Sequence, residues 1–136
     1  MFLRFPFNSD RKRITTGINY RNKKVLFLTG GSEIVLSACD NMYSSAPHAK
    51  GIVPIDRAAV DEELASLTRR GLRVVAMGVK NIEKEPSQAE IETKDKFGVR
   101  DIEKSGFTLL LLAGIQDLLR PESKDAIAQC NRAGVV

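Results

Sequence analysis

The stretch from Val25 to Cys39 constrains the fold of this chain most, because it predicts a strand that leads directly into a helix. The apolar residues 25–28 are typical of a short buried strand, and the glycine pair 30–31 bounds it. Ser32 suits the cap of the next helix, and Glu33 lies in its first turn, where the helix dipole favours an acid. Bare glycine backbone can lie against a ligand such as a nucleotide. An ordinary strand-to-helix turn has the same pattern, and the local pattern alone favours that ordinary interpretation.

The length and composition predict one soluble domain. A chain of 136 residues can bury a hydrophobic core, and 43% hydrophobic with 28% charged residues is typical of soluble proteins. The longest apolar run, residues 107–115, falls short of the ~20 residues that cross a bilayer and predicts a buried central strand. The N-terminal residues 1–6 contain Arg4 and Pro6 and do not resemble a signal peptide. We therefore expect a cytoplasmic location without direct membrane insertion.

The residues that usually carry metal or nucleophilic chemistry are scarce. Cys39 and Cys130 are far apart and have no metal-ligand spacing, as expected of reduced thiols in the cytosol. His48 is the only histidine in the sequence. These counts argue against a zinc site and against a histidine-based catalytic triad, so no metal site is predicted.

The basic residues suggest an anionic ligand. The formal net charge is +4 at pH 7, and basic side chains cluster at 11–13 and 21–24. Such clusters can be solvated strand edges that prevent pairing, or an electropositive site for phosphates. No nucleic-acid motif accompanies them. A small polyphosphate is therefore favoured over DNA or RNA, and no nucleic-acid partner is expected.

The rest of the first 80 residues alternates strands, turns and one helix. The turn residues after Tyr20 predict an antiparallel hairpin between two strands. Asp56 is placed to cap a helix with one apolar face, which ends at Gly71. The predicted strands cover residues 2–7, 14–20, 24–28 and 72–79, and residues 40–54 are predicted to be a loop.

The last third of the chain contains a charged stretch and a second helix. About half of residues 81–105 are charged and few are apolar, which predicts a mobile insertion with one helical turn. Residues 123–132 predict a helix with Ala126, Ile127 and Cys130 turned inward. The terminal residues 135–136 resemble the start of a further strand, so a new structural unit is expected to begin near residue 117.

Several segments together resemble the nucleotide-binding domain of P-type cation-transporting ATPases, in the plasma-membrane calcium pump branch. The resemblance covers almost the whole chain outside the charged insertion. Its segments occur in the family's order: Phe5 to Arg13, Thr29 to Glu33 with Cys39, Gly71 to Arg73, Gly114 to Glu122, and Asp125 to Ile127 with Cys130 and Ala133-Gly134.

The resemblance implies an α/β (α+β) fold like that of the P-type ATPase nucleotide-binding (N) domain. We expect an antiparallel sheet flanked by helices. Residues 1–116 would form a partial nucleotide-binding domain, with 81–105 as its insertion. Residues 117–136 would form the hinge and the first helix of the phosphorylation domain. The remaining domains of a pump, or an intact pump, are then the expected protein partners.

The resemblance also implies a role for individual residues. Phe7 matches a phenylalanine that stacks on adenine, and Lys12 matches a lysine of the same pocket. Gly30 matches the glycine beside the adenine, and Arg73 matches an arginine that reaches the phosphates. In isolation, Phe7 would be read as a core residue and Arg73 as a surface residue. The hinge positions are Asp117 and Arg120.

Two departures from the family pattern affect the site. The family's Lys-Gly-Ala appears here as Thr29-Gly30-Gly31, so the lysine at the adenine is replaced. Losing one charge-assisted contact costs ~1.5–3 kcal/mol. The hinge reads Asp117-Leu118-Leu119-Arg120 and lacks one proline of the family's pattern. Weak ATP binding is therefore expected.

The sequence lacks the motifs that carry the pump's chemistry. It contains no Asp-Lys-Thr-Gly-Thr for the phosphorylated aspartate and no Gly-Asp-Gly for magnesium. Magnesium would therefore act only through the absent phosphorylation domain. The predicted function is ATP binding within a P-type calcium pump, without phosphoryl transfer or transport by this chain alone. The alternative is a pump-derived protein that has lost nucleotide binding and acts through protein contacts.

Overall fold

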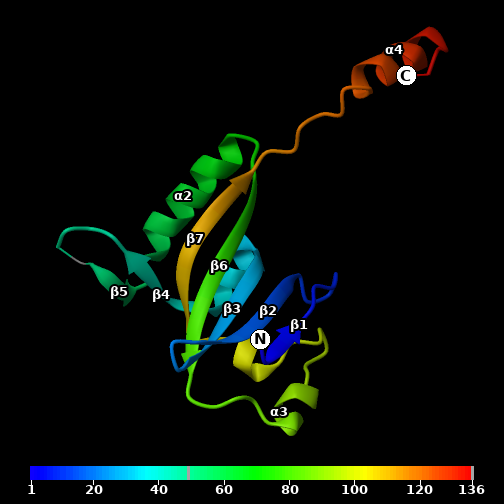
Figure 1. Ribbon diagram of the computed structural model, residues 1–136. Coiled ribbons are helices and arrows are strands. Elements are labelled where there is room, and N and C mark those ends of the chain that lie inside the picture. Colours follow the sequence, from blue (N-terminus) through cyan, green and yellow to red (C-terminus); the bar gives the residue numbers. More distant parts are fainter. Residues whose placement is uncertain (49, 136) are drawn as a thin grey trace.

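The computed structural model describes residues 1–48 and 50–135, and a seven-stranded sheet forms its centre (Figure 1). The order across the sheet is β1-β2-β3-β6-β7-β4-β5. Neighbouring strands are antiparallel, except for the parallel pair β4 and β7. The strands are β1 (Leu3–Phe5), β2 (Arg13–Tyr20), β3 (Lys23–Gly31), β4 (Cys39–Ser44), β5 (Gly51–Pro54), β6 (Arg73–Ile82) and β7 (Phe107–Ile115). The predicted α/β fold, a largely antiparallel sheet flanked by helices, is confirmed.

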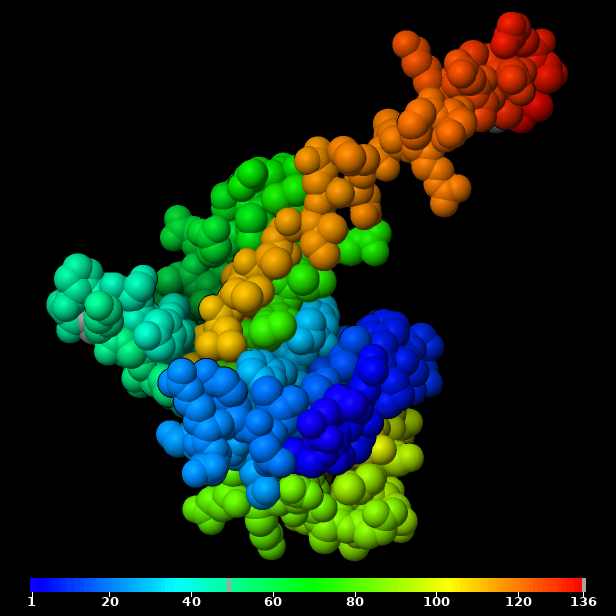
Figure 2. Space-filling view, in the orientation of Figure 1, coloured from blue at the N-terminus to red at the C-terminus, as the bar shows by residue number. Residues whose placement is uncertain are grey.

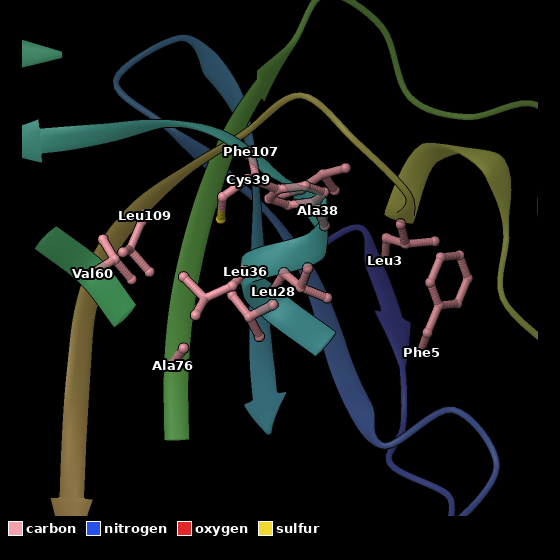
Figure 3. Packing of buried hydrophobic residues seen from close by; sticks show 12 residues of the cluster. Leu3, Phe5, Leu28, Leu36, Ala38, Cys39, Val60, Ala76, Phe107 and Leu109 are labelled. Atoms are coloured by element: carbon pink, nitrogen blue, oxygen red, sulfur yellow. The ribbon is translucent and has the colours of Figure 1, made fainter. Parts of the chain in front are cut away.

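Two helices cover one face of this sheet. They are α1 (Ser32–Ala38), which packs on β3, β6 and β7, and α2 (Arg57–Arg69), which packs on β6 and β7. Asp56 caps α2 by accepting a hydrogen bond from the N–H of Ala59, as predicted, and Gly71 follows its end with φ +73°. The core between the helices and the sheet is apolar (Figure 3), and includes Leu26, Leu28, Val35, Leu36, Val60, Ala76, Phe107 and Leu109.

The junction between β3 and α1 differs from the sequence prediction. β3 continues through both glycines, because Gly30 and Gly31 pair with β6, and Gly30 also pairs with β2. Gly31 is the N-cap, whereas Ser32 is the first helical residue and is buried. The prediction that Ser32 caps the helix is therefore wrong. Glu33 lies in the first turn as expected.

Residues 40–54 are not the loop that the sequence predicted. β4 and β5 form an antiparallel hairpin there, with Met42 opposite Val53. β4 also pairs with β7 along Cys39 to Met42, with a register shift at one position. The dense Asn, Ser and Pro residues obscured this strand, since it is held by pairing with a strand more than 60 residues away rather than by its own periodicity.

The charged stretch 81–105 contains two short helical segments, α3 (Gln88–Glu92) and the 3-10 turn η1 (Asp101–Glu103). Ser87 and Glu90 form a capping box at the start of α3. Val99 and Glu103 are buried, so the second half of the stretch is attached to the domain. The scarcity of apolar residues predicted a mobile insertion and did not reveal this attachment.

The C-terminal part leaves the sheet. β7 has the predicted bounds and is interior in the sheet, but it is buried only from Phe107 to Leu109. After an extended segment comes α4 (Ser123–Arg132), also with the predicted bounds, which stands away from the sheet (Figures 1 and 2). No residue of α4 is buried, so its apolar residues do not turn inward as predicted; these are Ala126, Ile127 and Cys130. A domain division at residue 117 stays a prediction, and Val136 lies outside the described residues.

Candidate functional site

The structure brings the predicted site residues to one end of the sheet. β2 begins at Arg13 opposite Gly30, near the end of β3. On the other side, Val75 of β6 lies opposite Gly31, so Arg73 is located at the same end. The β1–β2 connection, residues 6–12, carries Phe7 and Lys12 and leads directly into this end.

Gly30 lies where two backbone segments approach closely. A Cβ at this position would lie 2.5 Å from the carbonyl oxygen of Lys12 and 3.1 Å from the Cα of Arg13. At Gly31 an added Cβ would meet nothing within 4 Å. Gly30 thus has a structural requirement of its own, and Gly31 is the glycine with open space beside it.

Thr29 faces away from α1 and α2. Side chains alternate along a strand, and Leu28 belongs to the helix-covered core, so Thr29 points to the uncovered face. The register places Ile14 of β2 and Met77 of β6 on either side of Thr29. These three side chains are half-buried and form a continuous strip. By the same alternation, Arg73 lies on this uncovered face.

Phe7 and Lys12 are exposed in the β1–β2 connection. The Phe7 side chain is 59% exposed, so the structure does not support reading it as a core residue. Lys12 has φ +52°, and its N–H donates to the carbonyl oxygen of Asn8 at 2.9 Å. This hydrogen bond closes a tight turn that directs the chain into β2.

Arg73 forms an ion pair with Asp117. The guanidinium Nη2 lies 2.5 Å from the carboxylate Oδ2, and both side chains are largely exposed. The residue expected at the phosphates thus contacts the residue expected at the hinge. An exposed pair of this kind contributes only about 0–1 kcal/mol, so a phosphate can displace the carboxylate at little cost. Arg120 lies exposed in the extended segment after β7.

A buried polar cluster next to the connection was missed in the sequence. It consists of the Glu103 carboxylate and two buried donors to its Oε1, the Arg11 guanidinium and the Thr15 hydroxyl. Burial lowers the pKa of the neighbouring Arg13 and Arg100, and the negative charge of Glu103 opposes that shift in both. In the charged stretch 81–105, the apolar Val99 and Ile102 are the signal that could have predicted its packing on the domain.

A hollow of about 420 Å³ lies between the β1–β2 connection, α1 and the second half of the charged stretch. Its wall includes Lys12, Arg13, Ile34 of α1, Phe97 and Lys104. Lys12 is the one predicted site residue that lines it. This hollow is therefore separate from the strip around Thr29.

The described residues offer little for metal or thiol chemistry. No group of three or more His, Cys, Asp or Glu side chains is placed to hold a metal ion among residues 1–48 and 50–135. Burial raises the pKa of the Cys39 thiol to about 11, so it stays protonated at neutral pH. In the same residues, no helix is long and apolar enough to cross a membrane.

Comparison with known proteins identifies the family to which this chain belongs. A family model described as "P-type ATPase, cytoplasmic domain N" matches residues 2–122. The chain is 32% identical over 133 residues to human "Plasma membrane calcium-transporting ATPase 1", and 26% identical over 131 residues to "Putative calcium-transporting ATPase 11, plasma membrane-type" of Arabidopsis thaliana. Each match covers 96% of this chain but only 10% and 12% of the relative, respectively. The chain belongs to the family of P-type ATPase cytoplasmic N domains.

Proposed function

We propose that this chain binds ATP as part of a calcium-transporting P-type pump of the plasma-membrane type. One observation carries the proposal: the connection that holds Phe7 lies at the same end of the sheet as Thr29 and Arg73. The chain also belongs to a family of ATPase N domains. An exposed aromatic ring provides a stacking face for adenine, and an arginine provides a fork for phosphate oxygens. Calcium as the transported ion rests on the names of the relatives.

ATP binding by the isolated chain is weak. One stacking ring contributes ~1–3 kcal/mol, and the side chains of Lys12 in the adenine pocket and Arg73 at the phosphates are solvent-exposed. Thr29 supplies no charge to the strip. After the cost of association, about −4 kcal/mol remains, which corresponds to a Kd near 1 mM.

Phosphoryl transfer requires groups that this chain does not supply. An acceptor aspartate and a magnesium ion would come from the phosphorylation domain of the pump. The protein partners are therefore the other domains of a pump, and the working location is the cytoplasmic face of its membrane. In that assembly Asp117 and Arg120 lie in the hinge, and ATP displaces Asp117 from Arg73.

Amide chemical shifts during an ATP titration test the proposal. We expect shifts centred on Phe7, Gly30 and Arg73, with a Kd near 1 mM. Phe7→Ala should weaken binding about fivefold or more, since stacking is lost. Tyr20→Ala is the matched control, because Tyr20 is similarly exposed but lies at the opposite end of β2. An absence of shifts at all three residues with several millimolar ATP would rule the proposal out.

A second candidate function is binding to an intact pump through protein contacts. It is supported by the exposed side chains of Leu118 (81%) and Leu119 (88%), which no other part of the described chain covers. A purified calcium pump in detergent should then retain the chain whether or not ATP binds. Leu118→Ser with Leu119→Ser should abolish retention. Retention of this double variant at the wild-type level would exclude a contact through these leucines.

A further inference from the structure

Glu103 is a fully buried carboxylate in the stretch that the sequence describes as a charged insertion. Its side chain is 0% exposed. A buried carboxylate is stable only when it is paired and hydrogen-bonded. Oε1 accepts hydrogen bonds from Arg11 Nη2 and from the Thr15 hydroxyl, and Oε2 accepts one from the N–H of Arg100 at 3.1 Å. Figure 2 shows this stretch packed beneath the N-terminal strands.

Arg11 transmits this anchoring to the connection that carries Phe7. Its Nη1 donates to the carbonyl oxygen of Pro6 at 2.6 Å, directly before Phe7. Its backbone N–H donates to Asn8 Oδ1 at 2.7 Å, directly after Phe7. The Arg11 side chain is only 4% exposed, so these contacts are shielded from water.

The Phe7 ring has little packing of its own to hold it. It is largely exposed, and the positions of its two neighbours in the chain depend on Arg11. Lys12 depends on the same turn through its hydrogen bond to Asn8. Both predicted ligand contacts in the connection are thus fixed by one arginine, and that arginine is held by Glu103.

We propose that Glu103 is a positioning residue for the nucleotide site, acting through Arg11 on Phe7 and Lys12. This inference rests on the proposed ATP binding at Phe7. A connection that is already ordered does not lose conformational freedom when the ligand binds, which raises affinity. The stretch around Glu103 and the nucleotide are then coupled, and the coupling is reciprocal: ATP also stabilises the anchor.

The central experiment compares Glu103→Gln with the wild type in the ATP titration. Glutamine keeps the size and an oxygen acceptor but loses the charge that pairs with Arg11. We expect the Kd for ATP to rise threefold to tenfold, and the Phe7 and Lys12 amides of the ATP-free protein to broaden. Glu83→Gln is the matched control, because Glu83 is an exposed carboxylate of the same stretch. It should leave both measurements unchanged.

A double-mutant cycle separates positioning from a general structural role. In a Phe7→Ala background, Glu103→Gln should raise the Kd by a smaller factor than in the wild type, because only the positioning of Lys12 remains to be lost. An equal fold-change in both backgrounds would overturn the inference. So would an unchanged Kd together with sharp Phe7 and Lys12 amides in Glu103→Gln.

The wild-type protein gives a test that does not depend on a variant folding. Saturating ATP should slow hydrogen exchange of amides 99–104 about threefold, without affecting amides 83–87. Arg11→Lys provides a second variant, since lysine keeps the charge but cannot bridge Pro6 and Glu103 with a fork. It should raise the Kd as Glu103→Gln does. ATP shifts at Phe7 with unchanged exchange at 99–104 would overturn this inference alone, whereas no ATP shifts at Phe7, Gly30 or Arg73 would overturn the proposed function itself.

Discussion

Thr29 is the residue at which a single substitution most directly probes the nucleotide site. It lies half-buried on the uncovered face between Ile14 and Met77, at the position where the resemblance places a lysine. Thr29→Lys should tighten ATP binding by up to about tenfold through one charge-assisted hydrogen bond. Thr16→Lys is the control, because Thr16 lies on the same face, next to Phe27. Equal affinities of both variants and the wild type, measured by ATP titration, would show that the nucleotide does not lie over Thr29.

Alanine substitutions at the neighbouring Gly30 and Gly31 should have different effects on the free energy of unfolding. Gly30→Ala places a Cβ 2.5 Å from the carbonyl oxygen of Lys12, so the β1–β2 connection must shift. Overpacking of this kind costs about 1–3 kcal/mol. Gly31→Ala adds a Cβ that meets nothing within 4 Å, so it loses only the N-cap preference for glycine and should cost less than about 1 kcal/mol. Urea unfolding measures both, and equal midpoints would contradict the close approach.

At the scale of elements, the stretch 81–105 should exchange hydrogen in two distinct halves. Its second half is held by the buried Val99 and Glu103, whereas the residues of α3 are mostly exposed. Backbone N–H groups that are buried and bonded exchange slowly, because exchange requires local unfolding. We expect amides 99–104 to be protected at least tenfold more than amides 83–95 in the absence of ligand. Uniform fast exchange over 81–105 would support the fully mobile insertion that its composition predicts.

Local signals explain which elements could be predicted from the sequence. β7 and α4 have the predicted bounds because an apolar run and a helical period lie within each segment. The hairpin β4–β5 was missed because β4 is held by a distant partner, β7. Glu103 was missed for the same reason, since its partners Arg11 and Thr15 lie about 90 residues away in sequence. The site residues came from the resemblance, and the structure adds that Thr29 and Arg73 share the uncovered face.

The whole molecule has a covered face that gives stability and an uncovered face that is free for a ligand. α1 and α2 close one side of the sheet over a single apolar core. The other side keeps the half-buried strip of Ile14, Thr29 and Met77, which continues across the sheet to the exposed Leu111 (45%) opposite Met77. Such an arrangement leaves room for a ligand without opening the core. Stability should therefore depend on the covered side, and nucleotide affinity on the uncovered side and the connection beside it.

The C-terminal helix should contribute little to the stability of the rest of the chain. α4 has no buried residue, and Ile127 is 62% exposed. A helix of 10 residues without tertiary packing is marginal in water. Its amides should therefore exchange rapidly at low protein concentration and become protected only if copies associate. Strong protection of residues 123–132 at every concentration would show that α4 docks on the domain and that the division at residue 117 is wrong.

Removing residues 117–136 tests the same independence by equilibrium unfolding. The truncation deletes α4 and the Arg73–Asp117 ion pair. Because this ion pair is exposed, it contributes only about 0–1 kcal/mol to the free energy of unfolding. Asp117→Asn in the full chain removes the ion pair alone and is the matched control. We expect the truncated chain and Asp117→Asn to unfold at the same urea concentration, within about 0.5 kcal/mol of each other. If the truncation costs 2 kcal/mol or more beyond Asp117→Asn, the segment packs on the domain and belongs to it, because a helix that touches nothing cannot stabilise the sheet.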